Sequence, residues 1–440
     1  MKKSFLYISV LTLLLSKASI AQDDVYPAAK QSKKTAITNA TVHVGNGNVI
    51  ENGTIVFDNG KITYAGAAAG APSAETTIDA KGKHVYPGII LPASNLGLQE
   101  ISGVRGSTDV NEIGELNPSV RSIVAYKAES IVTNTIRANG ILFAHVAPGG
   151  QLIAGQSSVV QLDAWNWEDA AYKADNGMHF YMPSLLARPG GGRFAALLAL
   201  LGPQQSADPV KAALDRIEGV KAFFRQAKAY HQKDAGKEIN LKFEATKALF
   251  EKKQKFFIHC SQVKQMLIAI DFVKEFGFDV VVVGAGESWQ IADLLKQNNI
   301  SVILTQEHNL PTLDDDDVDQ PYKSATFLQK AGVLYCLNDD DPQNRGRNLV
   351  FNAGTAAAYG LGKEEALKAI TSNAAKVLGI DDRTGTIEVG KDANIVISEG
   401  DILDMKSSIV TNAFIQGRSI SLQSKHTQLF ERYKHKYGIK

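Results

Sequence analysis

Between residues 35 and 85 the sequence consists of short runs in which apolar and polar residues alternate. Turn-forming sequences separate these runs, among them Gly45-Asn46-Gly47 and Asp58-Asn59-Gly60. Alternation with a period of two predicts β-strands, and Asn-Gly pairs between such runs are typical of tight hairpins. The pattern therefore predicts a small all-β unit over residues 22–86.

The pattern then changes, and apolar runs alternate with amphipathic stretches that have the helical period. The expected strands cover residues 141–144, 256–258, 280–283, 302–304 and 333–337, and the expected helices cover residues 126–138, 210–232, 263–276 and 290–298. Strands that alternate with helices in this way indicate an α/β fold with a parallel sheet. We expect this domain to span residues 87–381.

Hairpin-like alternation returns over residues 382–425. Because the same kind of β sequence flanks the α/β domain on both sides, we expect the two flanks to form one composite β-sandwich into which the α/β domain is inserted. Residues 426–440 are basic and polar. They are expected to form a surface helix or tail.

The composition supports one large hydrophobic core and a smaller one, with 44% hydrophobic residues in a chain of 440. Lysine and arginine total 47 against 46 aspartate and glutamate, which gives a formal net charge of +1. That balance provides no long-range attraction to nucleic acid or to an anionic membrane, so neither is expected as a partner.

The two cysteines, Cys260 and Cys336, lie in apolar runs and are interpreted as small buried side chains. The sequence does not decide whether they form a disulfide.

The first residues resemble a secretory signal peptide. Lys2 and Lys3 precede an apolar run over residues 5–15, and Ser19-Ile20-Ala21 supplies small residues for cleavage. The run is shorter than the roughly 20 residues that a membrane span needs, which disfavours the alternative of an uncleaved anchor. We expect residues 1–21 to be removed and the mature chain to be periplasmic or secreted.

Three separated segments carry a family resemblance: Tyr86-Pro87-Gly88-Ile89-Ile90, residues 366–379 and residues 385–394. Together they resemble the amidohydrolase superfamily, in its imidazolonepropionase- and prolidase-like branch. The resemblance implies a distorted (β/α)8 TIM barrel with the composite β-sandwich beside it. It also implies hydrolysis of a C–N bond by one or two divalent ions, with zinc as the expected ion, at the C-terminal ends of the barrel strands.

The family's first barrel strand ends in His-x-His, and both imidazoles hold the metal. Here the matching positions read Ala93-Ser94-Asn95, and Gly284-Ala285-Gly286 stands where many relatives carry a further histidine after the sixth strand. Alanine has no donor atom and an asparagine amide is a poor zinc ligand, so the resemblance predicts an eroded metal site.

Two site residues remain by the same resemblance. His259 matches the metal-binding histidine at the end of the fifth strand. The alternative is a structural role, in which its ring hydrogen-bonds to the backbone at the strand end. Asp339 matches the catalytic aspartate after the eighth strand, where it would move the proton as a general base. Asp340 and Asp341 follow directly, so the register is open by one residue, and the acidic triplet has the alternative role of a helix cap.

Other residues could replace the missing ligands. His145, at the end of an apolar run, is the candidate for a further metal ligand. The remaining candidates are His179, His308, Glu287, which is more typical of a charge at a helix N-terminus, and Lys242 as a carbamylated bridge. The acidic run Asp314-Asp315-Asp316-Asp317 offers oxygens to a hard cation such as calcium but is more typical of a solvated loop. The glycine-rich segments at residues 148–156 and 190–192 are both expected to be turns, and the first could present backbone N–H groups to a substrate carboxylate.

Two hypotheses about function follow. The first is an exported hydrolase that acts on a small amide, cyclic amide or peptide-like substrate through a reduced metal site. The second is a non-catalytic pseudoenzyme that binds a ligand, or that serves as the partner subunit of an intact amidohydrolase. A homo-oligomer is compatible with both, and fold alone does not choose between them.

Overall fold

The computed structural model describes residues 26–101, 103–186, 208–233, 238–305, 307–311 and 315–439. The expected signal peptide over residues 1–21, the loop Gly190-Gly191-Gly192 and Asp314 of the acidic run lie outside these ranges. No helix within them combines the length and the apolar character that a bilayer span requires.

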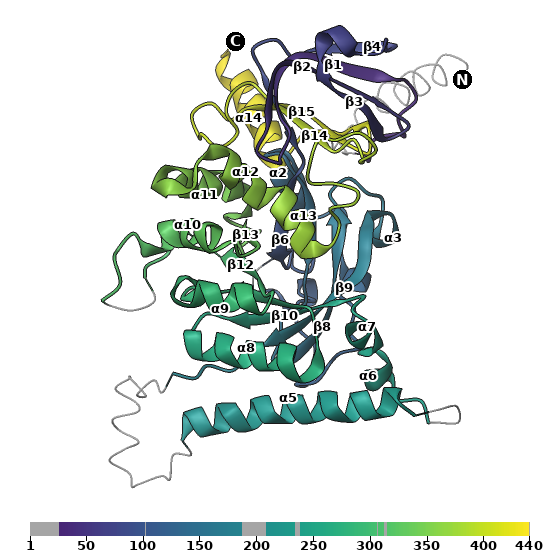
Figure 1. Ribbon diagram of the computed structural model, residues 1–440. Coiled ribbons are helices and arrows are strands. Elements are labelled where there is room, and N and C mark those ends of the chain that lie inside the picture. Colours follow the sequence, from purple (N-terminus) through teal and green to yellow (C-terminus); the bar gives the residue numbers. More distant parts are fainter. Residues whose placement is uncertain are drawn as a thin grey trace, which may run out of the picture.

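One mixed sheet is built from both flanks of the chain, as predicted (Figure 1). Its strands are β1 (Thr35–His43), β2 (Val49–Asp58), β3 (Lys61–Ala67), β4 (Thr76–Asp79), β5 (His84–Pro87), β14 (Ile395–Ser398), β15 (Val410–Ile415) and β16 (Arg418–Ser419). Their order is β16-β15-β14-β5-β1-β2-β3, with β4 paired to the other part of β1. The flanks meet where β5 pairs in parallel with β1 and antiparallel with β14.

Buried apolar side chains explain why the two flanks stay together. Val85 of β5, Ile395 of β14 and Phe414 of β15 share one hydrophobic cluster with residues of β1 and β2, and each of the three is at most 3% exposed. Burial of such side chains stabilises by roughly 1.5–3 kcal/mol each. The inserted domain therefore begins and ends at the same place in the fold.

The inserted domain is a nearly closed barrel of eight strands. They are β6 (Ile89–Ser94), β7 (Ile141–Val146), β8 (Leu152–Gln161), β9 (Ala171–Tyr181), β10 (Lys255–Cys260), β11 (Val280–Gly284), β12 (Ser301–Thr305) and β13 (Tyr335–Asn338), in that order across the sheet. The Ala93 backbone N–H donates a hydrogen bond to Asn338 Oδ1 at 3.0 Å, which connects the first strand to the last.

The third barrel strand departs from the sequence prediction. β8 runs antiparallel to both of its neighbours, whereas the other strand pairs are parallel. It also begins at Leu152, inside the glycine-rich segment for which we predicted a turn. All ten residues of β8 are buried, so both faces of the strand are covered and its sequence does not alternate between apolar and polar residues. Ser157 and Ser158 make this sequence resemble that of a loop.

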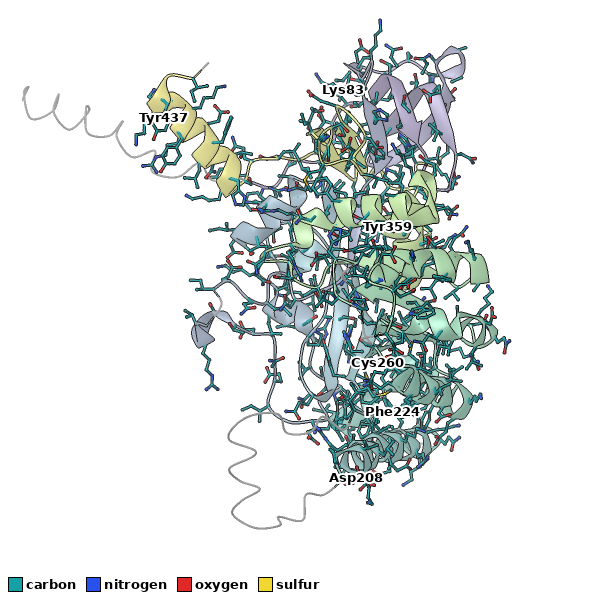
Figure 2. All side chains as sticks on the ribbon, turned by 90° about the vertical axis from the view of Figure 1, so that its left-hand side faces the viewer. Lys83, Asp208, Phe224, Cys260, Tyr359 and Tyr437 are labelled. Carbon is teal, nitrogen blue, oxygen red and sulfur yellow. The ribbon has the colours of Figure 1, made fainter. Side chains whose placement is uncertain are left out.

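The helices cover the outside of the barrel, with α5 crossing the end of the molecule farthest from the terminal sheet (Figure 1). They are α2 (Ile131–Arg137), α3 (Trp167–Ala170), α5 (Pro209–His231), α6 (Leu241–Glu244), α7 (Lys247–Phe250), α8 (Val263–Phe276), α9 (Ala292–Gln297), α10 (Gln320–Ala331), α11 (Leu349–Ala356), α12 (Lys363–Ile370), α13 (Ser372–Leu378) and α14 (Lys425–Tyr437). The predictions for α5, α8 and the surface helix α14 are confirmed. Figure 2 shows α14, with Tyr437 labelled, standing away from the rest of the molecule.

Both cysteines are buried and unpaired, as interpreted from the sequence. Cys260 ends β10 and Cys336 lies in β13. Burial raises the pKa of both thiols, so neither is a ready thiolate.

Gly177 marks the tightest packing between β9 and its neighbours. A Cβ atom there would lie 2.6 Å from a ring carbon of Phe257 and 2.6 Å from Ser157 Oγ. We expect Gly177→Ala to lower the free energy of unfolding by about 1–3 kcal/mol in urea denaturation, because the barrel must shift to admit the methyl group. The control is Gly219→Ala within α5, where no atom lies within 4 Å; that variant should gain about 0.5–1 kcal/mol. Equal effects at the two positions would contradict the packing argument.

Candidate functional site

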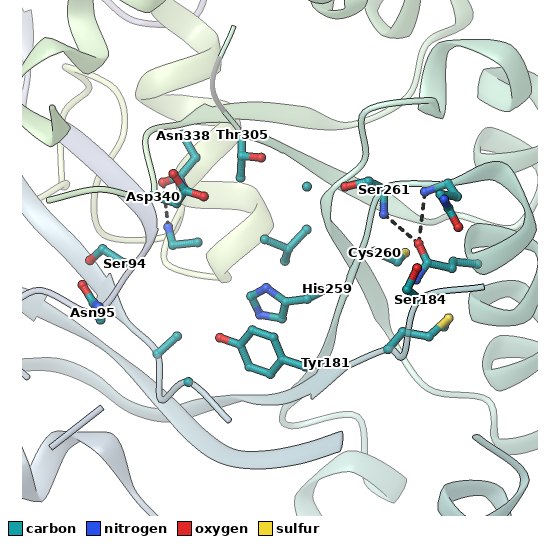
Figure 3. A pocket seen from close by; sticks show the side chains of 18 of the residues that line it. Ser94, Asn95, Tyr181, Ser184, His259, Cys260, Ser261, Thr305, Asn338 and Asp340 are labelled. Atoms are coloured by element: carbon teal, nitrogen blue, oxygen red, sulfur yellow. Dashed lines mark hydrogen bonds between the residues drawn. The ribbon is translucent and has the colours of Figure 1, made fainter. Parts of the chain in front are cut away.

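A cavity of about 650 Å³ opens at the C-terminal ends of the barrel strands (Figure 3). Neutral polar side chains make up much of its wall: Ser94, Asn95, Ser184, Ser261, Gln262, Gln265, Thr305 and Asn338. The ionisable side chains on the wall are Tyr181, His259, Cys260 and Asp340. The position is the one in which barrel proteins build their sites.

His259 lies on this wall at the end of β10, the fifth barrel strand, as the sequence predicted. Its ring stacks on Tyr181, with centroids 3.9 Å apart and planes 14° apart, and the Tyr181 hydroxyl donates to the Pro148 carbonyl at 3.0 Å. Burial, followed by the nearby His145, lowers the pKa of His259 to about 3. The imidazole is therefore neutral at physiological pH and is held at a fixed angle to the cavity (Figure 3).

Two further histidines continue from His259 into the barrel. His259 Nε2 lies 2.8 Å from His179 Nδ1, and the ring of His179 lies 5.5 Å from that of His145. His145 Nδ1 donates to the Pro92 carbonyl at 2.9 Å, which leaves His145 Nε2 without a proton when the ring is neutral. Burial lowers the pKa of His145 to about 4 and that of His179 well below its ordinary value.

His145 therefore lies behind the cavity rather than on its wall. Its side chain and that of His179 are fully buried. Among the described residues, neither His145 Nε2 nor His179 Nε2 has a hydrogen-bond partner. The sequence singled out His259 and His145 but gave little weight to His179, the residue that connects them.

The acidic triplet after β13 divides its side chains between the cavity and the protein interior. Asp340 lines the cavity and is 54% exposed. Asp339 is buried, is not part of the cavity wall, and accepts hydrogen bonds from the Asn352 side chain at 3.3 Å and the Asp341 backbone at 3.2 Å. Burial raises the pKa of Asp339. The carboxylate that a molecule in the cavity would meet is that of Asp340, and the catalytic role of Asp339 stays a prediction.

The first strand brings Ala93, Ser94 and Asn95 to the cavity wall. Gly284 reaches the same wall at the end of β11. Asn95 Oδ1 is buried and, within the described part of the chain, has no hydrogen-bond partner.

These residues do not fit a catalytic zinc ion, which usually takes three protein ligands. Across the ranges that the structure describes, no three His, Cys, Asp or Glu side chains are grouped so that they could hold a metal ion. The Nε2 atom of His259, the best donor on the wall, already faces His179.

The other candidate ligands lie elsewhere. Glu287 accepts a hydrogen bond from the Val263 backbone at 2.7 Å, at the start of α8, which confirms the interpretation as a charge at a helix N-terminus. Lys242 is exposed on α6, and exposed His308 bonds to Thr355 Oγ1 at 2.9 Å. None of the three is on the cavity wall.

The fold and the cavity define a barrel protein with an open cavity at the C-terminal ends of its strands. Residues 327–420 match the family model described as the amidohydrolase family. An imidazolonepropionase from Staphylococcus saprophyticus is 27% identical over 379 residues, which covers 80% of this chain and 85% of that protein. The chain belongs to the amidohydrolase superfamily, whose members are typically metal-dependent hydrolases.

A solved amidohydrolase structure from Thermotoga maritima supports the same assignment. It has 26% sequence identity and a TM-score of 0.72, and the match covers 88% of this chain and 100% of that one. The amidohydrolase tasK of Hapsidospora irregularis is 22% identical over 394 residues, which covers 81% of this chain. The match spans only 39% of that longer protein.

Proposed function

We propose that this chain is an exported hydrolase of the amidohydrolase family, acting on a C–N bond in a small amide, cyclic amide or peptide-like substrate with an eroded metal site. The observation that carries the proposal is the cavity itself, with His259 and Asp340 on its wall. Its volume of about 650 Å³ falls in the range in which proteins hold small ligands. The neutral polar side chains around it suit an amide, which both donates and accepts hydrogen bonds.

The surroundings of His259 support proton transfer by its imidazole. A neutral imidazole accepts a proton from a water molecule as that water attacks the carbonyl carbon, and returns it to the leaving nitrogen. Tyr181 and His179 hold the ring during this exchange, because they contact its face and its Nε2 atom. A base with a pKa of about 3 accepts protons weakly, so we expect slow turnover.

The proposal that the metal site is eroded rests on the first strand. Ala93 supplies no donor atom, and the Asn95 amide is a weak one. We therefore expect the mature chain, purified without added metal, to contain well below one equivalent of zinc, manganese or iron by elemental analysis.

His259→Gln tests the catalytic proposal. Release of ammonia or amine from a panel of small amides, lactams and dipeptides should fall by about 10²-fold or more, because glutamine keeps hydrogen bonding but cannot exchange the proton. His308→Gln is the matched control, since His308 is exposed, is not on the wall of the main cavity and hydrogen-bonds to Thr355 of α11. Equal rates in the two variants would contradict the role of His259.

A second function is favoured by one observation, the lack of a three-ligand group across the described residues. In that case the chain binds a small amide without turning it over, or assists an intact amidohydrolase as its partner. Calorimetric binding of panel compounds with no product after prolonged incubation would select this function over the hydrolase.

A further inference from the structure

A second, smaller cavity adjoins the main one. Its volume is about 120 Å³, and Ser261, Gly284 and Thr305 lie on the walls of both cavities. These three residues stand at the ends of β10, β11 and β12, so the small cavity extends the site past the fifth to seventh strands. The first-strand residues Ala93 and Asn95 and the proposed base His259 are not on its wall, whereas Gly284 and Gly286, after the sixth strand, are.

Glu307 lies on the wall of the small cavity, two residues beyond β12. The residue is only 4% exposed. Among the described residues, neither oxygen of its carboxyl group has a hydrogen-bond partner. A buried carboxyl group without a partner is costly, and burial raises its pKa well above the ordinary value, with a smaller opposing effect from the Ala356 backbone amide.

Gln320 has a similar position on the same wall. It is 7% exposed, and its Nε2 atom is buried with no hydrogen-bond partner in the described part of the chain. A half-turn of the terminal amide exchanges its nitrogen and oxygen, so Gln320 can offer either a donor or an acceptor. Two buried polar side chains on the wall of this cavity thus carry atoms that no other group of the described residues satisfies.

The charges around the small cavity have one sign. Asp316 is on its wall together with Glu307, and no lysine, arginine or histidine of the described residues is. The volume equals that of about four water molecules in the liquid, which is enough for an ammonium or guanidinium group.

We infer that the small cavity is a subsite for a positively charged group, an ammonium or guanidinium, carried by the molecule whose amide occupies the main cavity. The cation donates charge-assisted hydrogen bonds to Glu307 and accompanies the amide into the barrel mouth. The inference rests on the proposed function and deepens it, because it restricts the substrate to small cationic amides.

Binding of such a cation also moves a proton. At a pH below its raised pKa, the Glu307 carboxyl group loses its proton to solvent as the cation arrives, so the complex contains carboxylate and cation in place of a neutral acid and a hydrated cation. Calorimetry in buffers of different ionisation heat measures this release directly. A neutral ligand of the same shape leaves the proton in place.

Two amides of matched length test the subsite, 5-aminopentanamide, which is cationic at pH 7, and neutral pentanamide. We expect the cationic amide to bind the full mature chain about tenfold more tightly or better, with proton release. In Glu307→Gln the two should bind almost equally and without proton release, while pentanamide keeps its wild-type affinity. Glu168→Gln, at an exposed position on α3, is the matched control and should behave as wild type.

The outcomes separate the two proposals. Equal binding of both amides by the wild type, or an unchanged preference in Glu307→Gln, would overturn the subsite and leave the amide site intact. Failure of both amides to bind the wild type would overturn the proposed amide site and the subsite with it. The glutamine variant should fold, because it replaces a strained acid by a neutral group of the same shape.

Discussion

Replacing Asp163 with asparagine should lower the free energy of unfolding by about 3–5 kcal/mol. Asp163 lies just beyond β8, and its side chain is fully buried between two arginines. Arg137 Nη1 of α2 donates to Oδ1 at 2.8 Å, and Arg418 Nη1 of β16 donates to Oδ2 at 2.8 Å. The Ala28 backbone N–H donates to the same Oδ2 atom at 2.9 Å.

The large effect follows from what the substitution leaves behind. The side chains of Arg137 and Arg418 are only 4% and 10% exposed, so both guanidinium groups would stay buried without a counter-ion. The carboxylate also joins three parts of the chain that are far apart in sequence: the N-terminal segment at Ala28, the barrel at Asp163, and the terminal sheet at Arg418. Its loss should therefore loosen the barrel from the composite sheet.

Urea denaturation followed by fluorescence and by circular dichroism measures the change. Asp175→Asn is the control, because the Arg121–Asp175 pair has the same charges but side chains that are 41% and 30% exposed. We expect that variant to lose no more than about 1 kcal/mol. If Asp163→Asn lost no more stability than Asp175→Asn, the buried carboxylate would not be what holds the barrel and the composite sheet together.

Much of the fold was predictable because its strands have strong local patterns. The run of valines in β11 is buried almost throughout and predicts a strand with little ambiguity, which places Gly284 at its end. The apolar run of β10 places His259 at a strand end in the same way. Hairpin sequences in both flanks likewise predicted the composite sheet. β8 was missed for the opposite reason, since a strand with both faces covered and small polar side chains carries no period of two.

The candidate site was harder to predict, because it depends on which way side chains point. Asp339 and Asp340 are neighbours in sequence, yet one is buried and the other faces the cavity, and a shift of one residue along a strand end exchanges them. The contact between His179 and His259 joins two strands that are about 80 residues apart. Nothing in the local sequence of either residue reports that contact.

Glu307 was not identified from the sequence for a related reason. A polar residue soon after a strand normally predicts an exposed loop, and its neighbour His308 is indeed exposed. Only the tertiary structure, which brings Gln320 and Ser324 of α10 to the same cavity wall, shows that this one carboxyl group is enclosed. An enclosed acid with a raised pKa beside a cavity is a candidate for a functional site.

The same carboxyl group should make the protein less stable as the pH rises. Burial raises the folded pKa of Glu307 well above its ordinary value of 4.5, so between these two values the folded chain binds a proton that the unfolded chain has released. Stability therefore falls with increasing pH, by up to about 1.4 kcal/mol per pH unit from this group, and is fully retained only below the unfolded pKa. Glu307→Gln removes the titration, so the variant should gain stability relative to wild type as the pH rises from the unfolded pKa toward the raised folded pKa.

Urea denaturation of both proteins at pH 5, 6, 7 and 8 measures the difference, in which all other titrating groups cancel. Glu168→Gln should show a difference that does not depend on pH, because Glu168 is exposed. Saturating 5-aminopentanamide should flatten the wild-type curve, since an ionised Glu307 then has a cation beside it. Without ligand, the stability difference between wild type and Glu307→Gln could instead stay constant from pH 5 to pH 8. The carboxyl group would then already be ionised and paired in the folded protein. In that case the small cavity would have no unpaired carboxylate for a cationic substrate.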